Sequence, residues 1–213
     1  MPSKSTTVER KRPARRQRSD GERSRTAILN EAARLATVEG IGGLSLSRLA
    51  DAVGMSKSGL FAHFGSKEEL QLATIETAEG IFEEQVRHAA SPDQSGLERL
   101  RALLDAYLSY VESGTFPGGC FFASAMVELS QQPGPVRDRL VDFLADWMTT
   151  LEAAIKDAQR EGAIEKREDP AQLAFELEAF LLLANTEFAL AQGADPVKAG
   201  RRAIERRLEA ATT

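Results

Sequence analysis

The chain has 213 residues, 42% of them hydrophobic and 28% charged, an ordinary globular composition with enough apolar side chains for a core. A single cysteine excludes an internal disulfide framework, and with only two histidines the usual zinc spacings are excluded too. No apolar run reaches the ~18–20 residues that a membrane-spanning helix needs, and none follows the basic N-terminus. We therefore expect a cytoplasmic protein without a membrane partner.

The net charge of −5 conceals an asymmetry along the chain. The first 67 residues hold 13 Lys and Arg against 6 Asp and Glu, whereas the remaining residues hold 14 against 26. The basic part is a candidate for binding a polyanion, and the acidic part is not.

Residues 1–19 lack periodicity and are rich in Arg, Lys, Ser and Pro, which predicts a disordered basic arm. Such an arm either adds phosphate or minor-groove contacts beside a DNA-binding unit or serves only as a solubilising tail. From residue 20 onward the apolar residues recur at helical spacing, and the glycines of "EGIGG" end the first helix.

Serines mark the starts of the next three helices. Ser45 and Ser56 are predicted N-caps of two short helices, and Ser66 with Glu69 predicts a capping box that opens a longer helix over 66–89. Five further helices follow, over about 95–113, 119–131, 134–161, 170–191 and 195–211. No strand-like alternation occurs, so we expect an all-α fold of about nine helices, with domains at 20–66 and 67–213 after the arm.

The two short helices, joined through "VGMS", describe a helix-turn-helix, whose second helix lies in the major groove of DNA. Leu60 and Phe64 are predicted to pack inward. The outward face then carries small residues that permit close approach to bases, an aromatic ring and two basic side chains: Lys57, Ser58, Gly59, Phe61, Ala62 and His63.

The stretch "GLSLSRLADAVGMSKSGLFAHFGSKEELQLA" resembles the DNA-binding signature of the TetR family of one-component transcriptional regulators. The resemblance implies that Ser45 touches a phosphate, that Lys57 reaches phosphate or base, and that His63 lies against the DNA backbone. Lys67 would bind a phosphate, assisted by the dipole of the helix that it opens. Without this motif, a lone histidine between apolar residues is more often half-buried and structural.

This chain departs from the family pattern in the recognition helix. It has Ser58-Gly59-Leu60-Phe61 where Gly-Thr-Leu-Tyr is usual, so Phe61 lacks the hydroxyl that commonly donates to a phosphate. Gly59 offers no side chain for base reading, and Ala62 stands where a longer side chain is common. Base readout would then rest on Lys57, Ser58, backbone approach and DNA shape.

The resemblance further implies a small-molecule effector cavity in the acidic part, with a hydrophobic or aromatic effector releasing the protein from DNA. Apolar rings with polar handles are the candidates, although for each of them a plain core position is the competing interpretation: Tyr107, Tyr110, Phe121, Phe122, Met126, Phe143 and Trp147. Cys120 lies at a helix start, where redox sensing is conceivable, but a small packed residue is preferred because no basic residue is near it in sequence.

The helix over 170–191 is apolar almost all the way round, so one side can face the core and another a partner chain. The resemblance implies a homodimer that reads a pseudo-palindromic operator, with repression as the family default. The candidate interface residues are Phe180, Leu181, Ala184, Phe188, Ile204 and Leu208. Asn185 either faces water or satisfies a buried group, with a hydrogen bond across the interface as the sharper alternative, and Glu187 is expected to face water.

Other classes of protein are less consistent with the sequence. No nucleophile with a base, metal set or phosphate loop is evident, and "GIGG" at 40–43 follows a helix rather than a strand, so neither an enzyme nor a cofactor is expected. A helix-turn-helix protein without an effector remains the main alternative. A helical module that binds acidic protein or membrane would be dismissed by salt-dependent binding to duplex DNA.

Overall fold

The computed structural model describes the backbone of residues 14–191 and 193–212, and the side chains of these residues from residue 21 onward. Within these ranges the chain folds into nine α-helices, one 3-10 turn and a single isolated β-bridge, so the predicted all-α class is confirmed. None of the helices described is long and apolar enough to cross a membrane. Most of the predicted basic arm, residues 1–13, lies outside the described residues.

The first helix, α1 Ala14–Glu39, begins six residues before the expected start, so residues 14–19 are helical and not part of a disordered arm. Its inward side buries Ile28, Ala32 and Ala36 at helical spacing. The helix stops at Gly40, whose φ of 81° is the left-handed conformation that glycine adopts without a Cβ penalty.

Two short helices follow, α2 Leu46–Ala52 and α3 Lys57–Phe61, and both predicted caps are confirmed. The Ser45 hydroxyl accepts from the Arg48 amide at 3.1 Å, and the Ser56 hydroxyl accepts from the Gly59 amide at 3.1 Å. These bonds satisfy amides that a helix start otherwise leaves without partners. The orientation of the short α3 is thus fixed by local chemistry.

The long helix α4 Lys67–Gln85 is capped by Ser66 as expected, but the capping box is incomplete. The Glu69 carboxylate accepts from the Gly65 amide at 3.0 Å rather than from the Ser66 amide. The helix also ends before residue 89, because the chain tightens into a 3-10 turn, η1 Arg87–Ala89. A complete capping box is formed instead by Ser95 and Glu98 at the start of α5.

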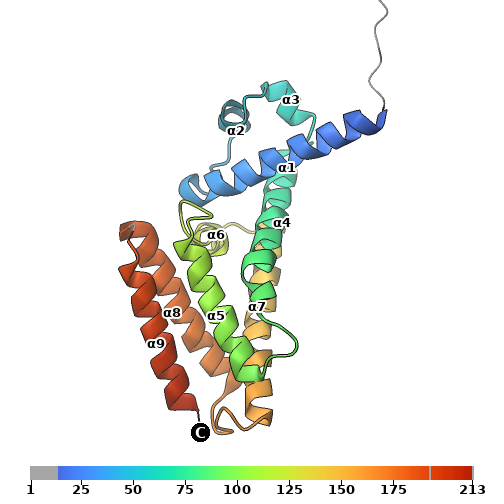
Figure 1. Ribbon diagram of the computed structural model, residues 1–213. Helices are drawn as coiled ribbons and strands as arrows, with labels where there is room; N and C mark the ends of the chain where they lie inside the picture. Colours follow the sequence, from blue (N-terminus) through green and yellow to red (C-terminus); the bar gives the residue numbers. More distant parts are fainter. Residues whose placement is uncertain (1–13, 192, 213) are drawn as a thin grey trace, which may run out of the picture.

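The larger bundle contains α5 Gly96–Glu112, α6 Phe121–Leu129, α7 Pro135–Arg160, α8 Pro170–Ala191 and α9 Asp195–Ala211. Figure 1 shows α5, α7, α8 and α9 running roughly alongside one another, with α8 and α9 at one side of the bundle. The short α6 lies at the top of the bundle, beneath α1. The helices α2 and α3 lie at the opposite end of the molecule from the C-terminus, and α4 runs from that end into the bundle (Figure 1).

Candidate DNA-binding face and effector cavity

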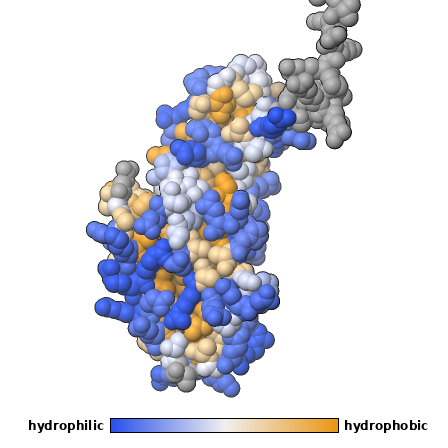
Figure 2. Space-filling view, in the orientation of Figure 1, coloured by the Kyte–Doolittle hydropathy of each residue, from blue (hydrophilic) through white to orange (hydrophobic). Residues whose placement is uncertain are grey.

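The outward face of α3 is exposed as predicted. Lys57, Ser58 and Ala62 are exposed, and the Phe61 side chain is 52% exposed, while Leu60 and Phe64 are buried against the rest of the small domain. Figure 2 shows a small hydrophobic patch among hydrophilic side chains at this end of the molecule. This face is largely polar, with one exposed ring, and its small residues leave room for the backbone of α3 to approach base edges closely.

Arg25 of α1 fixes the end of this face, a role that the sequence reading missed. Its guanidinium donates to the His63 carbonyl oxygen at 2.6 Å and lies 4.4 Å from the centroid of the Phe64 ring. His63 itself is half-buried, with its ring 6.3 Å from that of Phe64. The only signal in the sequence is a basic residue one helical turn before a buried position, which is too common to be diagnostic.

Lys67 is exposed near the start of α4, but its ammonium already has an intramolecular partner. The Nζ atom donates to the Gly42 carbonyl oxygen at 2.5 Å, and the Gln71 side chain donates to the Ile41 carbonyl oxygen at 2.9 Å. Lys67 therefore supports the α1–α2 loop, and any phosphate contact would be additional to that role.

The same loop is held from the other side by α6. The Glu128 carboxylate accepts from the Ile41 amide at 2.7 Å and from the Gly42 amide at 2.6 Å. A Cβ added at Gly40 or Gly42 would meet this carboxylate, so the two glycines allow its close approach. One carboxylate thus ties the larger bundle to the end that carries α2 and α3 through two charge-assisted bonds.

A second junction lies at the start of α6. The Gly118 amide donates to the Thr37 hydroxyl at 3.2 Å, and a Cβ at Gly118 would collide with the Thr37 carbonyl oxygen. The backbones of α1 and of the segment before α6 are therefore in direct contact. Together with Glu128, this contact makes α6 a second element, beside α4, that joins the two parts.

The interior of the bundle holds a cluster of aromatic rings around Phe82 of α4. The Phe82 centroid lies 5.2 Å from those of Phe143 and Trp147 and 6.2 Å from that of Tyr107, in edge-to-face arrangements. The rings of Phe122 and Phe143 stack at 3.4 Å. Between these rings is a cavity of ≈ 10 Å³, about enough for one water molecule.

Polar groups are placed at this cavity. Glu178 of α8 is partly exposed as a residue, but its carboxyl is enclosed: it accepts from the Trp147 indole nitrogen at 2.8 Å, and burial raises its pKa to about 7. The buried hydroxyls of Tyr107 and Tyr110 lie near the Cys120 thiol, a weak partner, and make no hydrogen bond of good geometry. The pKa values of both tyrosine hydroxyls are raised well above their usual range, mainly by burial and secondly by the nearby Cys120 thiol. Unpaired buried polar atoms are costly, so these groups suit a partner that the cavity does not itself supply.

Cys120 lies at the cavity wall, fully buried. Burial raises the pKa of its thiol to about 11, so the thiol remains protonated near neutral pH and lacks the reactive thiolate of a redox sensor. Its backbone amide donates to Asn185 Oδ1 at 2.7 Å. Asn185 is buried and satisfies a buried amide of its own chain, which confirms the second alternative given for it without a bond across the interface, whereas Glu187 is exposed.

The predicted effector residues fall into two groups. Tyr107, Phe122, Phe143 and Trp147 line the cavity. Tyr110 adjoins it, with its ring 6.4 Å from that of Tyr107. Phe121 packs instead between Phe116 and Phe122, and Met126 is a half-buried residue packed on the core, so neither lines the cavity. The lining residues that the sequence reading missed are Phe82, Cys120, Ala123, Leu144, Glu178 and Leu182.

The outer side of α8 and α9 carries a shallow apolar groove. It is lined by residues of both helices: Phe180, Leu183, Ala184, Glu187, Pro196, Ala199, Gly200 and Ala203. Exposed apolar side chains of α8 extend the same broad face, with Phe175 65%, Leu183 58% and Leu190 81% exposed. Of the predicted interface residues, Phe180 and Ala184 line this groove and Phe188 is half-buried on α8.

The structure corrects the three other interface residues. Leu181 and Leu208 are fully buried inside their own subunit, and Ile204 is 4% exposed and lies outside the groove, so none of the three lines it. Ile204 lies between α5 and α9, beside Leu104 and Leu108. The cause is that α8 and α9 use one apolar side for their own bundle and leave a different side exposed.

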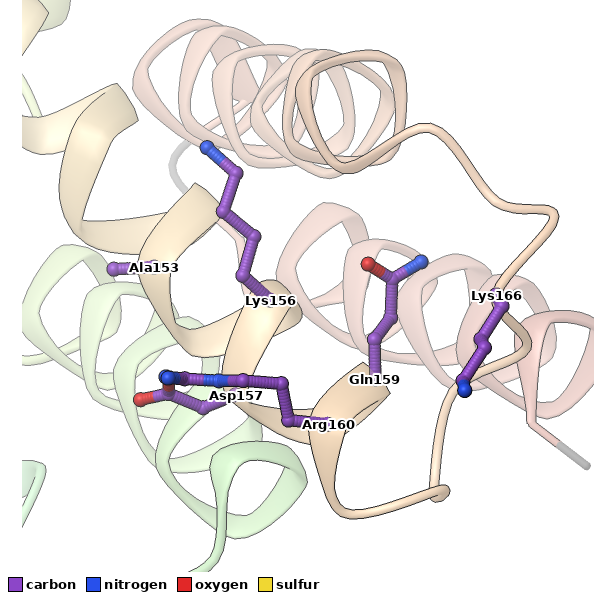
Figure 3. Close-up of a pocket in the computed structure, with 6 residues that line it drawn as sticks. All are labelled: Ala153, Lys156, Asp157, Gln159, Arg160 and Lys166. Atoms are coloured by element: carbon purple, nitrogen blue, oxygen red, sulfur yellow. The ribbon is translucent and has the colours of Figure 1, made fainter.

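A further surface hollow lies at the end of α7, and Figure 3 shows its six lining side chains. They are spread along the outside of the helix and the following connector rather than converging on one point. Asp157 is already paired with Arg160 and Arg99. The hollow is therefore an ordinary charged surface and adds no binding site, and the part of the chain that the structure describes holds no metal-binding cluster of His, Cys, Asp and Glu.

Comparison with known proteins gives two family matches in this chain. Residues 28–74 match "Bacterial regulatory proteins, tetR family", and residues 96–204 match "Tetracyclin repressor-like, C-terminal domain". The HTH-type transcriptional activator FasR of Mycolicibacterium smegmatis is 31% identical over 119 residues, which are 53% of this chain. The matched region spans 54% of FasR, about half of its length.

Solved structures show the same architecture. A TetR transcriptional regulator from Chloroflexus aurantiacus superposes with a TM-score of 0.80 at 25% identity, over 90% of this chain and 95% of that one. AibR, solved in complex with isovaleryl coenzyme A and operator DNA, gives a TM-score of 0.65 at 29% identity, over 76% of this chain and 85% of that one.

Proposed function

Because this chain belongs to the TetR family of bacterial regulatory proteins, which are DNA-binding transcription factors and not enzymes, we propose that it represses transcription as a homodimer on a pseudo-palindromic operator. A small molecule bound in the aromatic cavity would release it. We assign DNA binding to residues 20–66 and effector binding and dimerisation to residues 67–213, in the cytoplasm. The exposed, serine-capped α3 face is the observation that carries this proposal.

The α3 face supports major-groove binding through its chemistry and its position. Lys57 and Ser58 are exposed at the start of α3, and Gly59 and Ala62 leave the backbone accessible. Phe61 would pack on a sugar or a thymine methyl group. Ser45 is exposed at the start of α2, beside the groove that α3 would enter.

Lys57→Ala tests this face. We expect the substitution to weaken operator binding and to reduce the slope of log affinity against log salt concentration by about one, because one phosphate contact releases about one counterion. Fluorescence anisotropy titrations at several salt concentrations measure the slope.

The matched control is Lys156→Ala, which removes a lysine from α7 in the bundle and should leave the slope unchanged. An unaltered slope for Lys57→Ala would remove Lys57 from the DNA contact.

The effector site is supported by the cavity and by a relative. AibR was crystallised with both isovaleryl coenzyme A and operator DNA, so a related protein binds a small molecule and DNA. In this chain the cavity is small, and a ligand would have to part the rings that now fill it. The alternative, a DNA binder without an effector, requires that no small molecule alters operator affinity.

We infer that α6 carries the signal from the cavity to the DNA-binding end. Its first turn contributes Phe122 and Ala123 to the cavity, and Glu128 near its other end binds the α1–α2 loop. A ligand that displaces the first turn would therefore move the carboxylate that positions this loop. The two hydrogen bonds of Glu128 are either formed or broken, and a switch between two conformations of the loop requires such a pair of states.

Glu128→Ala should uncouple the two parts. We expect hydrogen exchange at the Ile41 and Gly42 amides to accelerate at least about tenfold, since losing the acceptor of a buried amide costs roughly 1–3 kcal/mol. Operator affinity should fall several-fold because the helices α2 and α3 of each chain are no longer held in position. NMR or mass-spectrometric exchange on the full chain measures the first effect.

Glu84→Ala is the control, since Glu84 is an exposed acid on α4 away from the loop. Wild-type exchange rates at both amides in Glu128→Ala would show that the carboxylate does not hold the loop.

A further inference from the structure

The cavity places a carboxylate among aromatic rings without a cation beside it. Among the described residues that line it, the titratable groups are Tyr107 of α5, Cys120 before α6 and Glu178 of α8, all of which are acids. Glu178 receives a single hydrogen bond from a neutral donor, the Trp147 indole. Ionising such a buried group without a counter-ion is costly.

The surrounding rings are suited to hold a positive charge. Phe82, Tyr107, Phe122, Phe143 and Trp147 line the cavity, and ring faces attract cations through their quadrupoles. Phe143 already faces one cation from outside the lining set, because the Arg87 guanidinium carbon of η1 lies 5.6 Å from its centroid. The unpaired hydroxyl of Tyr107 offers an acceptor to an ammonium group.

We propose that this cavity, widened as the rings that now fill it part, binds a lipophilic cation, an amine or quaternary ammonium compound, with Glu178 as its counter-ion and the rings around Phe82 as its apolar cage. This inference rests on the proposed effector site and specifies the chemical class that it accepts. A bound anion would be repelled by the Glu178 carboxylate, and a neutral ligand would supply no positive charge to balance it.

The exposure of the lining residues indicates where the ligand enters. Phe82, Tyr107, Phe122 and Trp147 are fully buried, whereas Leu144 of α7 and both Glu178 and Leu182 of α8 are partly exposed. The thinnest wall therefore lies between α7 and α8, and Glu178 stands at that wall. A cation would meet the carboxylate first and the rings behind it afterwards.

Three probes of similar size and different charge test the proposal by calorimetric titration of the full chain at pH 8. They are phenethylamine, 2-phenylethanol and phenylacetate. We expect phenethylamine to bind at least about tenfold more tightly than the alcohol, and phenylacetate to bind most weakly. Equal or tighter binding of the alcohol or the acid, or no binding of the amine at millimolar concentration, would overturn the proposal.

Glu178→Gln separates charge from shape, since the amide oxygen can still accept from the Trp147 indole. We expect the variant to lose at least about tenfold in affinity for phenethylamine and to keep that for 2-phenylethanol within twofold. Its thermal unfolding confirms folding, and Glu209→Gln, an exposed acid on α9, is the matched control. Unchanged amine affinity in Glu178→Gln would contradict the assignment.

The pH dependence gives an independent readout. Burial raises the pKa of Glu178 to about 7, so below pH 7 an amine must displace a proton from its carboxyl. The affinity for the amine should therefore decrease with each pH unit below 7, by a factor that approaches about ten. Tyr107 and Cys120 stay protonated throughout because burial raises their pKa values. A flat profile from pH 8 to 5.5 would contradict the counter-ion role.

Operator binding measured on the same samples distinguishes the two levels of the proposal. If the chain binds an operator but shows no preference for the amine, the cation class is wrong and the proposed regulator stands. If it binds no duplex, the proposed function fails, whatever the calorimetry shows.

Discussion

Leu183→Glu is expected to convert the dimer to monomers and to lower operator affinity by roughly 100-fold or more, because each half-site then binds alone and the gain from linkage is lost. Leu183 lines the apolar groove between α8 and α9 and is 58% exposed, so a charge there is tolerated by the free subunit. At the centre of a paired interface the same charge would be buried without a partner.

The position of Leu183 within α8 supports this choice. Phe175, Leu183 and Leu190 are spaced by eight and seven residues, which places them on one broad face of the helix. Exposed large apolar side chains gathered on one face indicate an interaction surface more strongly than the same residues scattered singly.

Sedimentation and anisotropy titrations measure the two effects. Val141→Glu is the matched control, because Val141 is an exposed apolar residue of α7 outside the groove and should leave dimer and affinity intact. A dimer with wild-type operator affinity in Leu183→Glu would move the interface elsewhere.

Glu178→Gln should stabilise the protein at pH 8 relative to the wild type, and much less at pH 5. Burial raises the pKa of Glu178 from 4.5 to about 7, so the folded state retains a proton that the unfolded state releases. The contribution of the protonated Glu178 to stability therefore declines as pH rises from about 4.5 and is gone above about 7. At ~1.4 kcal/mol per pKa unit, the loss is about 3 kcal/mol.

Urea unfolding of both proteins at pH 5 and pH 8, at one fixed protein concentration, measures this difference. Any effect of the amide group itself is common to both pH values, so the change between them reports ionisation alone. An equal difference in free energy of unfolding between the two proteins at both pH values would show that the ionised Glu178 does not destabilise the fold.

The sequence predicted the local features well because they are determined locally. Ser45, Ser56 and Ser66 cap their helices through bonds to amides three residues away, so the signal lies within four residues of the chain. The helix-turn-helix followed from the spacing of such signals. Helix ends without a strong signal were misplaced, as at the start of α1 and the end of α4.

The cavity was only partly predictable because lining depends on tertiary packing. Aromatic side chains marked Tyr107 and Trp147 as candidates, but nothing in the α4 sequence indicates that Phe82 lies at the centre of the rings. Glu178 is one of several acids along its helix, and only its hydrogen bond to Trp147 distinguishes it from Glu176, which pairs with Arg207.

The interface was harder to predict for a different reason. The helix α8 is apolar nearly all the way round, so periodicity cannot tell the side that faces the bundle from the side that faces a partner. Leu181 and Leu183 look equivalent in the sequence, yet one is fully buried and the other is 58% exposed. The packing of α5, α7 and α9 against α8 makes that difference.

Selection of bound fragments from a duplex DNA library, followed by measurement of the mass of the resulting complex, shows whether the chain binds an operator as a dimer. We expect a pseudo-palindromic sequence to be enriched and each duplex to carry an even number of chains, bound in a salt-dependent manner. Enrichment of no sequence, or a complex with a single chain per duplex, would contradict this expectation.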